Sequence, residues 1–465
     1  MKGHENIRIR NIKRIKNTEM KTGKRNFFML LFALGMIASV HAQEQSPLYL
    51  TLEKALEIAL SKNPTIKIAG KEIERLEYAK KEAWGNFFPT IDAVGQYERN
   101  IKKMVMSFQG QTVVIGSNNT FNAGITASVP LFNMSLYKMT QLSELNIELA
   151  LENSRGSRIN MKNEVEKAFY LMLLTQDLYA VMQKSMNNAQ ESYEDVKNKY
   201  EQGLVAEFDL IRTEVQVSNL QPNLIEAENS VELAKFQLKL LTGIPLDENI
   251  IAEGSLVDYE SEYVNFNDLY NYALDQNVTL KQLELQNQLL NKQLELQKAS
   301  YLPSVGLSYN YMFMSMSDDL KISDYNWHKT STLGLSVRMP IFSGFTRKHK
   351  TAQIKSNIEA LKLQRDYAAT GLNVQVKNAL TNMQKATEQL ESNKTGIRAA
   401  EKAYSIAQVR YKSGMGILLE LNDADTALRQ AQLNYNQSIY NYMTAKSNYD
   451  LLLGKEYTTN TNNNN

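Results

Sequence analysis

Two segments of this chain, far apart in the sequence, follow one pattern: Tyr-x-x-Gly and then a long helical stretch. They are Lys199–Leu210 (KYEQGLVAEFDL) and Arg410–Leu421 (RYKSGMGILLEL). The glycine of each segment is followed 40 residues later by another glycine, at Gly243 and Gly454. A match that keeps its spacing over such a length indicates one duplicated structural unit, although 465 residues would otherwise suggest two or three domains.

Apolar and small residues recur with a heptad spacing between the glycines of each segment. They are Thr213, Val217, Leu220, Leu224, Ala227, Val231, Ala234, Leu238 and Leu241 in the first, and Ala424, Leu428, Ala431, Tyr435, Ser438, Tyr442, Ala445, Tyr449 and Leu452 in the second. A heptad of this length requires a partner helix. Gly203 and Gly414 fit left-handed caps that end the preceding helices. Each repeat is therefore predicted to be a helical hairpin with its tip at the glycine. Pro222 is expected to bend the first of these helices or to remove one of its backbone hydrogen bonds.

The N-terminus has the pattern of a secretory signal. Basic residues precede an apolar run over 27–38, and Val40-His41-Ala42 precedes Gln43. This pattern predicts a signal peptide over 1–42, with translation expected to start at Met20. A membrane anchor helix is the alternative, but the run is shorter than the roughly 18 residues that an anchor needs.

Composition excludes several classes of protein. The chain has no cysteine, so disulfides, a thiol nucleophile and lipid attachment at a cysteine are excluded. Its 52 basic and 50 acidic residues nearly balance and give no reason to expect nucleic acid as a partner. There is no His-Glu-x-x-His, Gly-x-Ser-x-Gly or P-loop pattern, so we predict a protein that is not an enzyme and has no cofactor.

Between the helical stretches the period changes to two. Odd-numbered positions are apolar and even-numbered positions mostly polar over 305–313, and the same alternation follows Pro89. Each such strand leads into a polar loop and a returning strand that ends in a Pro-x-Phe turn, at Pro130 and at Pro340. We therefore predict β-hairpins over about 90–131 and about 304–341, with strands long enough to cross a bilayer.

The predicted layout is the same in both halves. A first repeat covers 43–254 and a second covers 255–454, each with helices, a β-hairpin, a helix of about 70 residues, a glycine tip and a returning helix. Seventy helical residues extend about 105 Å. The last segment, 455–465, is rich in Asn and Thr and is predicted to be disordered.

Four membrane-length strands cannot close a barrel, and an open sheet edge in lipid leaves backbone groups unpaired. If the strands lie in a membrane, two to four chains must complete the wall together. The signal, the duplication, the proline-bounded hairpins and the paired Tyr-x-x-Gly tips resemble the TolC-type outer-membrane efflux proteins over about 48–454.

The resemblance implies a mixed α and β membrane protein in the outer membrane. Its fold would be a trimeric 12-stranded transmembrane β-barrel, with four strands per chain in contact with lipid, continued by an α-helical coiled-coil tunnel through the periplasm. It also implies a periplasmic adaptor and an inner-membrane pump as partners in efflux or type I secretion, with passive conduction of solute. The rival interpretation is a coiled-coil stalk or adhesin-like envelope protein, which explains the heptads but not the two hairpins.

The tips are the first candidate site. In the family, the sequence around this glycine is where adaptor hairpins dock, and the resemblance assigns that role to Gly203, Leu204, Val205, Gly414, Met415 and Gly416. The ordinary alternative is a helix cap with apolar neighbours. We favour docking because the side chains of Leu204 and Met415 would otherwise be exposed apolar groups.

A tunnel gate is the second candidate site. Glu420 and Asp423 lie three residues apart on one helix face, and three subunits would place six carboxylates around one axis, where they attract cations. Two acidic residues early in a helix also suit its dipole. The resemblance further assigns Asp209 and Tyr411 to a hydrogen-bond lock, whose usual basic residue is replaced here by Gly416.

Methionines suggest a further alternative. Met104 and Met106 lie in or beside one hairpin loop, and Met312, Met314 and Met316 alternate along a strand of the other hairpin. Thioethers bind Cu(I), so copper efflux is conceivable. Methionine is more often adaptable apolar filler, and we expect no metal site. The histidines outside the signal, His328 and His349, are expected to be surface or loop residues.

Overall fold

The computed structural model describes residues 47–108, 110–256 and 274–457. The predicted signal peptide and most of the predicted disordered tail lie outside these ranges. The chain divides into two compact units, a small one of residues 1–48 and 247–250 and a large one of residues 49–246 and 251–465. Within the small unit, the Leu48 N–H donates to the Asn249 carbonyl at 2.8 Å. Everything that follows concerns the large unit.

A short pair of helices opens the large unit, and a second helix later in the chain begins in the same way. Helices α2 (Leu52–Lys62) and α3 (Pro64–Gly85) meet at Asn63, because a residue that precedes proline avoids the helical conformation. The Asn63 side chain accepts from the Thr65 N–H at 2.8 Å and donates to the Leu241 carbonyl at 2.7 Å.

Helix α7 (Val278–Ala299) has the same 22-residue length as α3. Its N-cap Asn277 accepts from the Thr279 N–H at 3.0 Å and donates to the Leu452 carbonyl at 3.3 Å. In both places one asparagine caps a helix and holds the end of a distant helix, so the two junctions are built alike.

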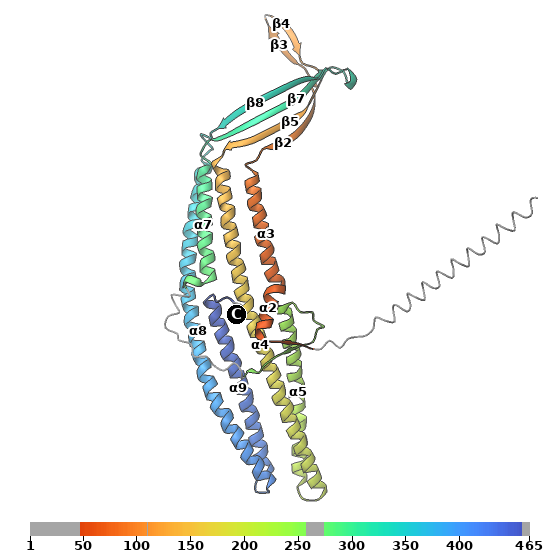
Figure 1. The fold of residues 1–465 in the computed structure, drawn as a ribbon, viewed down its shortest axis with the longest axis vertical. Helices are drawn as coiled ribbons and strands as arrows, with labels where there is room; N and C mark the ends of the chain where they lie inside the picture. Colours follow the sequence, from red (N-terminus) through yellow and green to blue (C-terminus); the bar gives the residue numbers. More distant parts are fainter. Residues whose placement is uncertain (1–46, 109, 257–273, 458–465) are drawn as a thin grey trace, which may run out of the picture. The chain divides into compact units, whose positions relative to one another are not determined.

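Four long helices form the two predicted hairpins. They are α4 (Met134–Glu201), α5 (Glu207–Thr242), α8 (Thr346–Lys412) and α9 (Leu418–Leu452). The 68 residues of α4 extend about 100 Å. Helix α5 packs along α4, whereas α9 packs against both α8 and α4 (Figure 1). None of the helices in the described ranges has both the length and the hydropathy required to cross a membrane.

The heptad correctly predicts the buried face of α5. Leu220, Ala234 and Leu238 are buried, while Leu240, which lies off the heptad, is exposed. The helix continues through Pro222, which lies on the exposed side. Water can therefore bond to the carbonyl that lacks its usual helical partner there.

Helix α9 is buried on more than its heptad face. Tyr435, Tyr442 and Tyr449 lie on the heptad and are buried, but so are Ile439 and Met443, which lie off it. The second face is covered because α9 lies between two long helices. The heptad alone indicated one partner, and the structure gives α9 two.

Four of the strands form an antiparallel sheet in the order β2-β5-β7-β8. Its members are β2 (Thr90–Arg99), β5 (Asn119–Phe132), β7 (Ser304–Ser317) and β8 (His328–Arg338). The two predicted hairpins are thus joined through β5 and β7. Leu307 lies opposite Leu335 and Tyr309 opposite Leu333, so one face of the sheet is apolar, as predicted. The other face carries Ser, Thr and Asn, and also Met312, Met314 and Met316 of β7.

The predicted polar loop of the first hairpin is in part wrong, because it contains a second ribbon. Strands β3 (Met104–Phe108) and β4 (Gln111–Ile115) pair with each other, and Gly110 beside their turn has φ 80°. The loop of the second hairpin holds only a short 3₁₀ turn, η2 (Ile322–Asp324).

Candidate functional site

The first tip joins α4 to α5 through a left-handed glycine. Gly203 has φ 74°, its N–H donates to the Tyr200 carbonyl, and the Leu204 N–H donates to the Lys199 carbonyl, both at 2.8 Å. These two bonds end the helix as predicted and use carbonyls that would otherwise lack partners. The turn leaves the Leu204 side chain 69% exposed, while Val205 is half-buried.

The second tip, between α8 and α9, is built alike but tighter. Gly414 has φ 72°, and the N–H groups of Met415 and Gly416 both donate to the Arg410 carbonyl, at 2.9 and 3.0 Å. A Cβ at position 416 would lie 3.1 Å from the Arg410 Cβ. A basic side chain at Gly416 would therefore press against this turn. Met415 is 70% exposed, and Ile417, which the sequence did not single out, is exposed beside it.

The two carboxylates predicted to line a gate lie on the exposed side of the start of α9. Glu420 and Asp423 are exposed, whereas Asn422 and Asp425 are buried against the neighbouring helices. Glu420 forms an ion pair with Arg410 at 3.5 Å, in which both side chains are about half exposed, so the pair contributes little stability. The carboxylates are thus accessible to ions in solution.

Tyr411 contacts the other hairpin of the same chain. Its hydroxyl donates to Asp195 on α4 at 3.3 Å, and Lys199 holds the same carboxylate at 2.7 Å while lying 5.0 Å from the Tyr411 ring centroid. Burial raises the pKa of Tyr411, and the hydrogen bond to Asp195 raises the pKa of Lys199. Both groups therefore keep their protons at neutral pH. Among the described residues no bond joins Tyr411 to Asp209, which lies in the first turn of α5.

These groups line a polar cavity of about 360 Å³ between α4 and the α8–α9 hairpin. Deeper along it, the Asn188 amide donates to Asp425 at 3.2 Å and to the Tyr404 hydroxyl at 3.4 Å. Burial also raises the pKa of Tyr404. The contacts between the two hairpins near the tips are therefore polar and can exchange with water, unlike the apolar heptads within each hairpin.

A partly buried carboxylate lies further along the same contact between α4 and α9. Glu166 accepts a 2.5 Å hydrogen bond from Ser447 and lies 3.8 Å from Lys162. Burial raises the pKa of Glu166 in spite of both contacts. A carboxyl whose pKa is raised by folding stabilises the fold most at low pH, and this contribution falls as the pH rises through the folded-state pKa.

Glu166→Gln should therefore raise the melting temperature by a few degrees at pH 8 and leave it little changed at pH 4, where the carboxyl is largely protonated in both the folded and the unfolded state. The amide oxygen keeps an acceptor for Ser447 and removes the buried charge. Thermal unfolding followed by circular dichroism at both pH values measures this. Glu164→Gln, at an exposed position two residues away, is the matched control and should change neither value. A destabilised Glu166→Gln variant at pH 8 would show that the ionised form is favoured by its partners.

The methionines and histidines lie apart from the tips. Met312, Met314 and Met316 share one face of β7, and His328, the first residue of β8, lies opposite Met314. His349 lies on the exposed side of α8. Within the described ranges, no group of three or more His, Asp or Glu side chains is placed to hold a metal ion.

Comparison with known proteins shows the family to which the chain belongs. The family model described as "Outer membrane efflux protein" matches residues 55–244 and 269–455, which is more than half of the chain. The chain is 24% identical over 340 residues to the alkaline protease secretion protein AprF of Pseudomonas aeruginosa, covering 70% of this chain and 68% of that protein. It is 20% identical over 348 residues to the outer membrane protein TolC of Escherichia coli K12, covering 73% and 70%.

The fold is similar to that of solved outer membrane channels. The CmeC channel of Campylobacter jejuni superposes with a TM-score of 0.69 at 18% identity, covering 87% of this chain and 85% of that one. Its helices and strands follow the same mixed arrangement.

Proposed function

Because this chain belongs to the outer membrane efflux protein family, we propose that it works as a homotrimer, the outer-membrane channel of a tripartite efflux or type I secretion system. In this proposal each chain is internally duplicated, three chains pool their strands in a 12-stranded barrel, and their long helices continue it as a tunnel through the periplasm. The channel conducts solute passively, and an inner-membrane pump supplies the energy.

The observation that carries the proposal is the four-stranded sheet with two open edges. Strands β2 and β8 form its edges, and the apolar face exposes Ile91, Leu333 and Val337. Such a face suits lipid, but lipid does not tolerate open edges. A neighbouring chain that pairs its β2 with β8 removes one edge of each sheet, and repeating the same contact closes a ring in which no edge is left open.

The tips support the assignment of an adaptor to the far end of the helices. Leu204 and Met415 place apolar side chains in water at the ends of two hairpins of like construction. Exposed apolar groups of this kind mark interaction sites. We assign Gly203, Leu204, Val205, Gly414, Met415 and Gly416 to adaptor docking.

The gate assignment rests on the tip geometry. Glu420 and Asp423 would line the tunnel end, and the polar contact of Tyr411 with Asp195 and Lys199 would join the two hairpins of one subunit in the closed state. This contact takes the place of the lock through Gly416. Asp209, at the start of α5, remains available to bond to a neighbouring subunit.

Purification and conductance test the proposal. The protein should require detergent, have the mass of a trimer by light scattering, and form discrete channels in planar bilayers. A protein that stays soluble and extended without detergent and forms no channels would instead be a coiled-coil stalk.

A further inference from the structure

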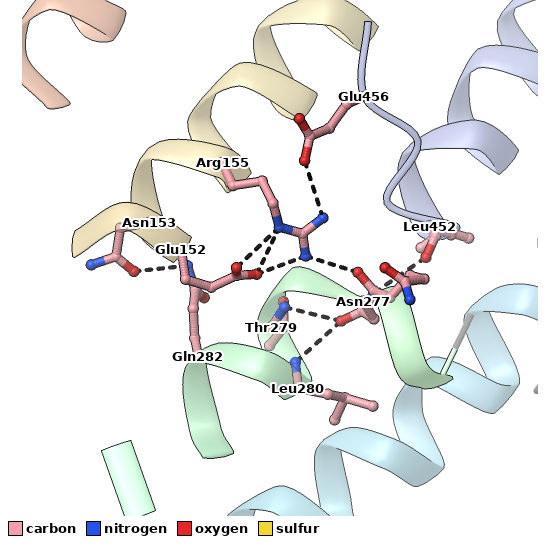
Figure 2. Close-up of polar contacts among 10 residues, drawn as sticks. Glu152, Asn153, Arg155, Asn277, Thr279, Leu280, Gln282, Leu452 and Glu456 are labelled. Atoms are coloured by element: carbon pink, nitrogen blue, oxygen red, sulfur yellow. Dashed lines mark hydrogen bonds and ion pairs between the residues drawn. The ribbon is translucent and has the colours of Figure 1, made fainter. Parts of the chain in front are cut away.

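One cluster of polar contacts joins the two halves of the chain, where α4 meets the start of α7 (Figure 2). Arg155 on α4 donates to Glu152 at 2.7 Å and to the Gln276 carbonyl at 2.9 Å, and its guanidinium lies 3.7 Å from Glu456. Gln282 on α7 donates to Asn153 at 2.9 Å. These contacts fix how the second half of the chain packs on the first.

The helices come closest beside Arg155. A Cβ built on Gly156 would lie 2.7 Å from Cγ1 of Val278 and 3.8 Å from its Cβ. Ile159 and Asn163, further along the same face of α4, are buried, and Asn163 donates to Ser447 of α9 at 2.9 Å. This whole face of α4 is covered by elements of the other half.

The two halves can be aligned residue by residue. Helices α3 and α7 have equal length and equivalent asparagine caps, 214 residues apart. Helices α4 and α8 run without a break to tip glycines that lie 211 residues apart. A Cβ on Gly243 would lie 3.6 Å from the Lys62 carbonyl, and one on Gly454 would lie 2.6 Å from the Gln276 carbonyl, so Lys62 and Gln276 are equivalent.

These offsets give counterparts to the main contact residues of the two halves. Arg155, Gly156 and Asn163 on α4 correspond to Asp366, Tyr367 and Val374 on α8; Gln276, Val278, Gln282 and Ser447 correspond to Lys62, Pro64, Ile68 and Phe236. All seven counterparts are exposed. The α8 face that includes Leu363 (72% exposed) and Tyr367 (83%) is uncovered, although the equivalent face of α4 is buried.

We propose that this α8 patch, formed by Leu363, Asp366, Tyr367 and Val374, binds a second copy of the chain at its α2–α3 patch, formed by Lys62, Pro64 and Ile68, and at Phe236. The contact repeats, between copies, the packing of α7 and α9 on α4 within one copy. One chain carries both patches on different elements, so the contact is head-to-tail and closes in a ring. The proposal rests on the trimer of the proposed function and specifies its helical interface.

The chemistry of the two patches is complementary. A carboxylate cannot donate to the Lys62 carbonyl as Arg155 does to the Gln276 carbonyl, but Asp366 can pair with the Lys62 ammonium of the second copy. The hydrogen bond between Asn163 and Ser447 is replaced by an apolar contact of Val374 with Phe236. Tyr367 meets Pro64 and Ile68 (69% exposed), so its bulk is matched by apolar neighbours.

A further polar contact between the halves has no such counterpart. Lys138 on α4 pairs with Glu295 on α7 at 2.9 Å. Their counterparts are His349 and Lys81, which do not attract each other. Among these contacts between the halves, only that of Arg155 with Gln276 therefore corresponds to two oppositely charged residues on neighbouring copies, Asp366 and Lys62. This is the ion pair to test.

Charge exchange is the first test. Asp366→Lys and Lys62→Asp should each weaken the trimer. The protein concentration below which detergent-solubilised trimers dissociate should rise by roughly tenfold or more. The double variant should restore the stability of the trimer, which a loss of folding could not do. Single variants that leave the trimer unaffected, or a double variant no better than either single variant, would overturn the ion pair.

Disulfide formation is the second test, and the chain has no cysteine to interfere. The 3.8 Å between the Cβ positions at 156 and 278 equals the usual Cβ separation in a disulfide. Tyr367→Cys combined with Pro64→Cys should therefore cross-link neighbouring subunits on mild oxidation. Val374→Cys combined with Pro64→Cys, two helical turns away, is the matched control and should not.

Absence of the first cross-link in intact trimers would contradict this interface alone. A wild-type protein that is monomeric in detergent would contradict the proposed function as well.

Discussion

Cells whose channel carries Leu204→Lys together with Met415→Lys are expected to lose efflux completely. Both side chains are exposed apolar groups at the hairpin tips, and adaptor docking would bury them. An unpaired charge buried in an interface costs about 3–5 kcal/mol, which is more than a hundredfold in affinity. Accumulation of an exported solute, measured against cells that lack the channel, reports the loss.

The conservative exchange of Leu204→Met with Met415→Leu is the control, and it should leave efflux near the wild-type level because side-chain volume is kept. Trimers and single-channel conductance should be normal in both variants, since neither tip contributes to the sheet. Normal efflux in the lysine variant would rule out these tips as docking points.

Removing the carboxylates at the start of α9 is expected to weaken cation block. In the proposed trimer, Glu420 and Asp423 would place six carboxylates around one axis, and their summed field would hold multivalent cations. The double variant Glu420→Ala, Asp423→Ala should raise the hexamminecobalt concentration needed to block single channels by roughly tenfold. The block should also weaken with salt in the wild type.

Glu401→Ala is the matched control for charge, because Glu401 is exposed on α8 well before the tip. Its block should equal that of the wild type. If the double variant is blocked as strongly as the wild type, Glu420 and Asp423 do not line the constriction.

The hydrophobic periodicity of the sequence predicted the helices and strands well, because an element that buries one face must repeat its apolar residues with its own helical or strand period. The heptad identified Leu220 and Leu238 as buried, and the alternation of β7 and β8 placed Leu307 and Leu335 on one face. It could not predict that Ile439 is buried, because that depends on a second helix packing against α9. Hydrophobic periodicity shows which face of a helix is apolar. A second helix that packs through a partly polar contact, as α4 does on α9, changes this periodicity little.

The partners of the site residues were harder to predict. The sequence placed Tyr411 at a tip but gave no sign that Asp195, on another helix, accepts its hydroxyl. The spacing of Asp195 and Lys199 indicated only an ordinary ion pair along one helix. The ribbon of β3 and β4 had a signal in the run of β-branched residues that follows Gly110, Thr112 to Ile115, which the interpretation as a polar loop passed over.

The asparagine caps of α3 and α7 have a consequence for the order of folding. Asn63 reaches the Leu241 carbonyl across 178 residues, and Asn277 reaches Leu452 across 175. A chain that emerges from its N-terminus cannot make either bond until the whole of the corresponding hairpin has followed. Each half can therefore complete its fold only after its last helix, α5 or α9, has been exported. Closing these long loops is expected to be the slow step of folding.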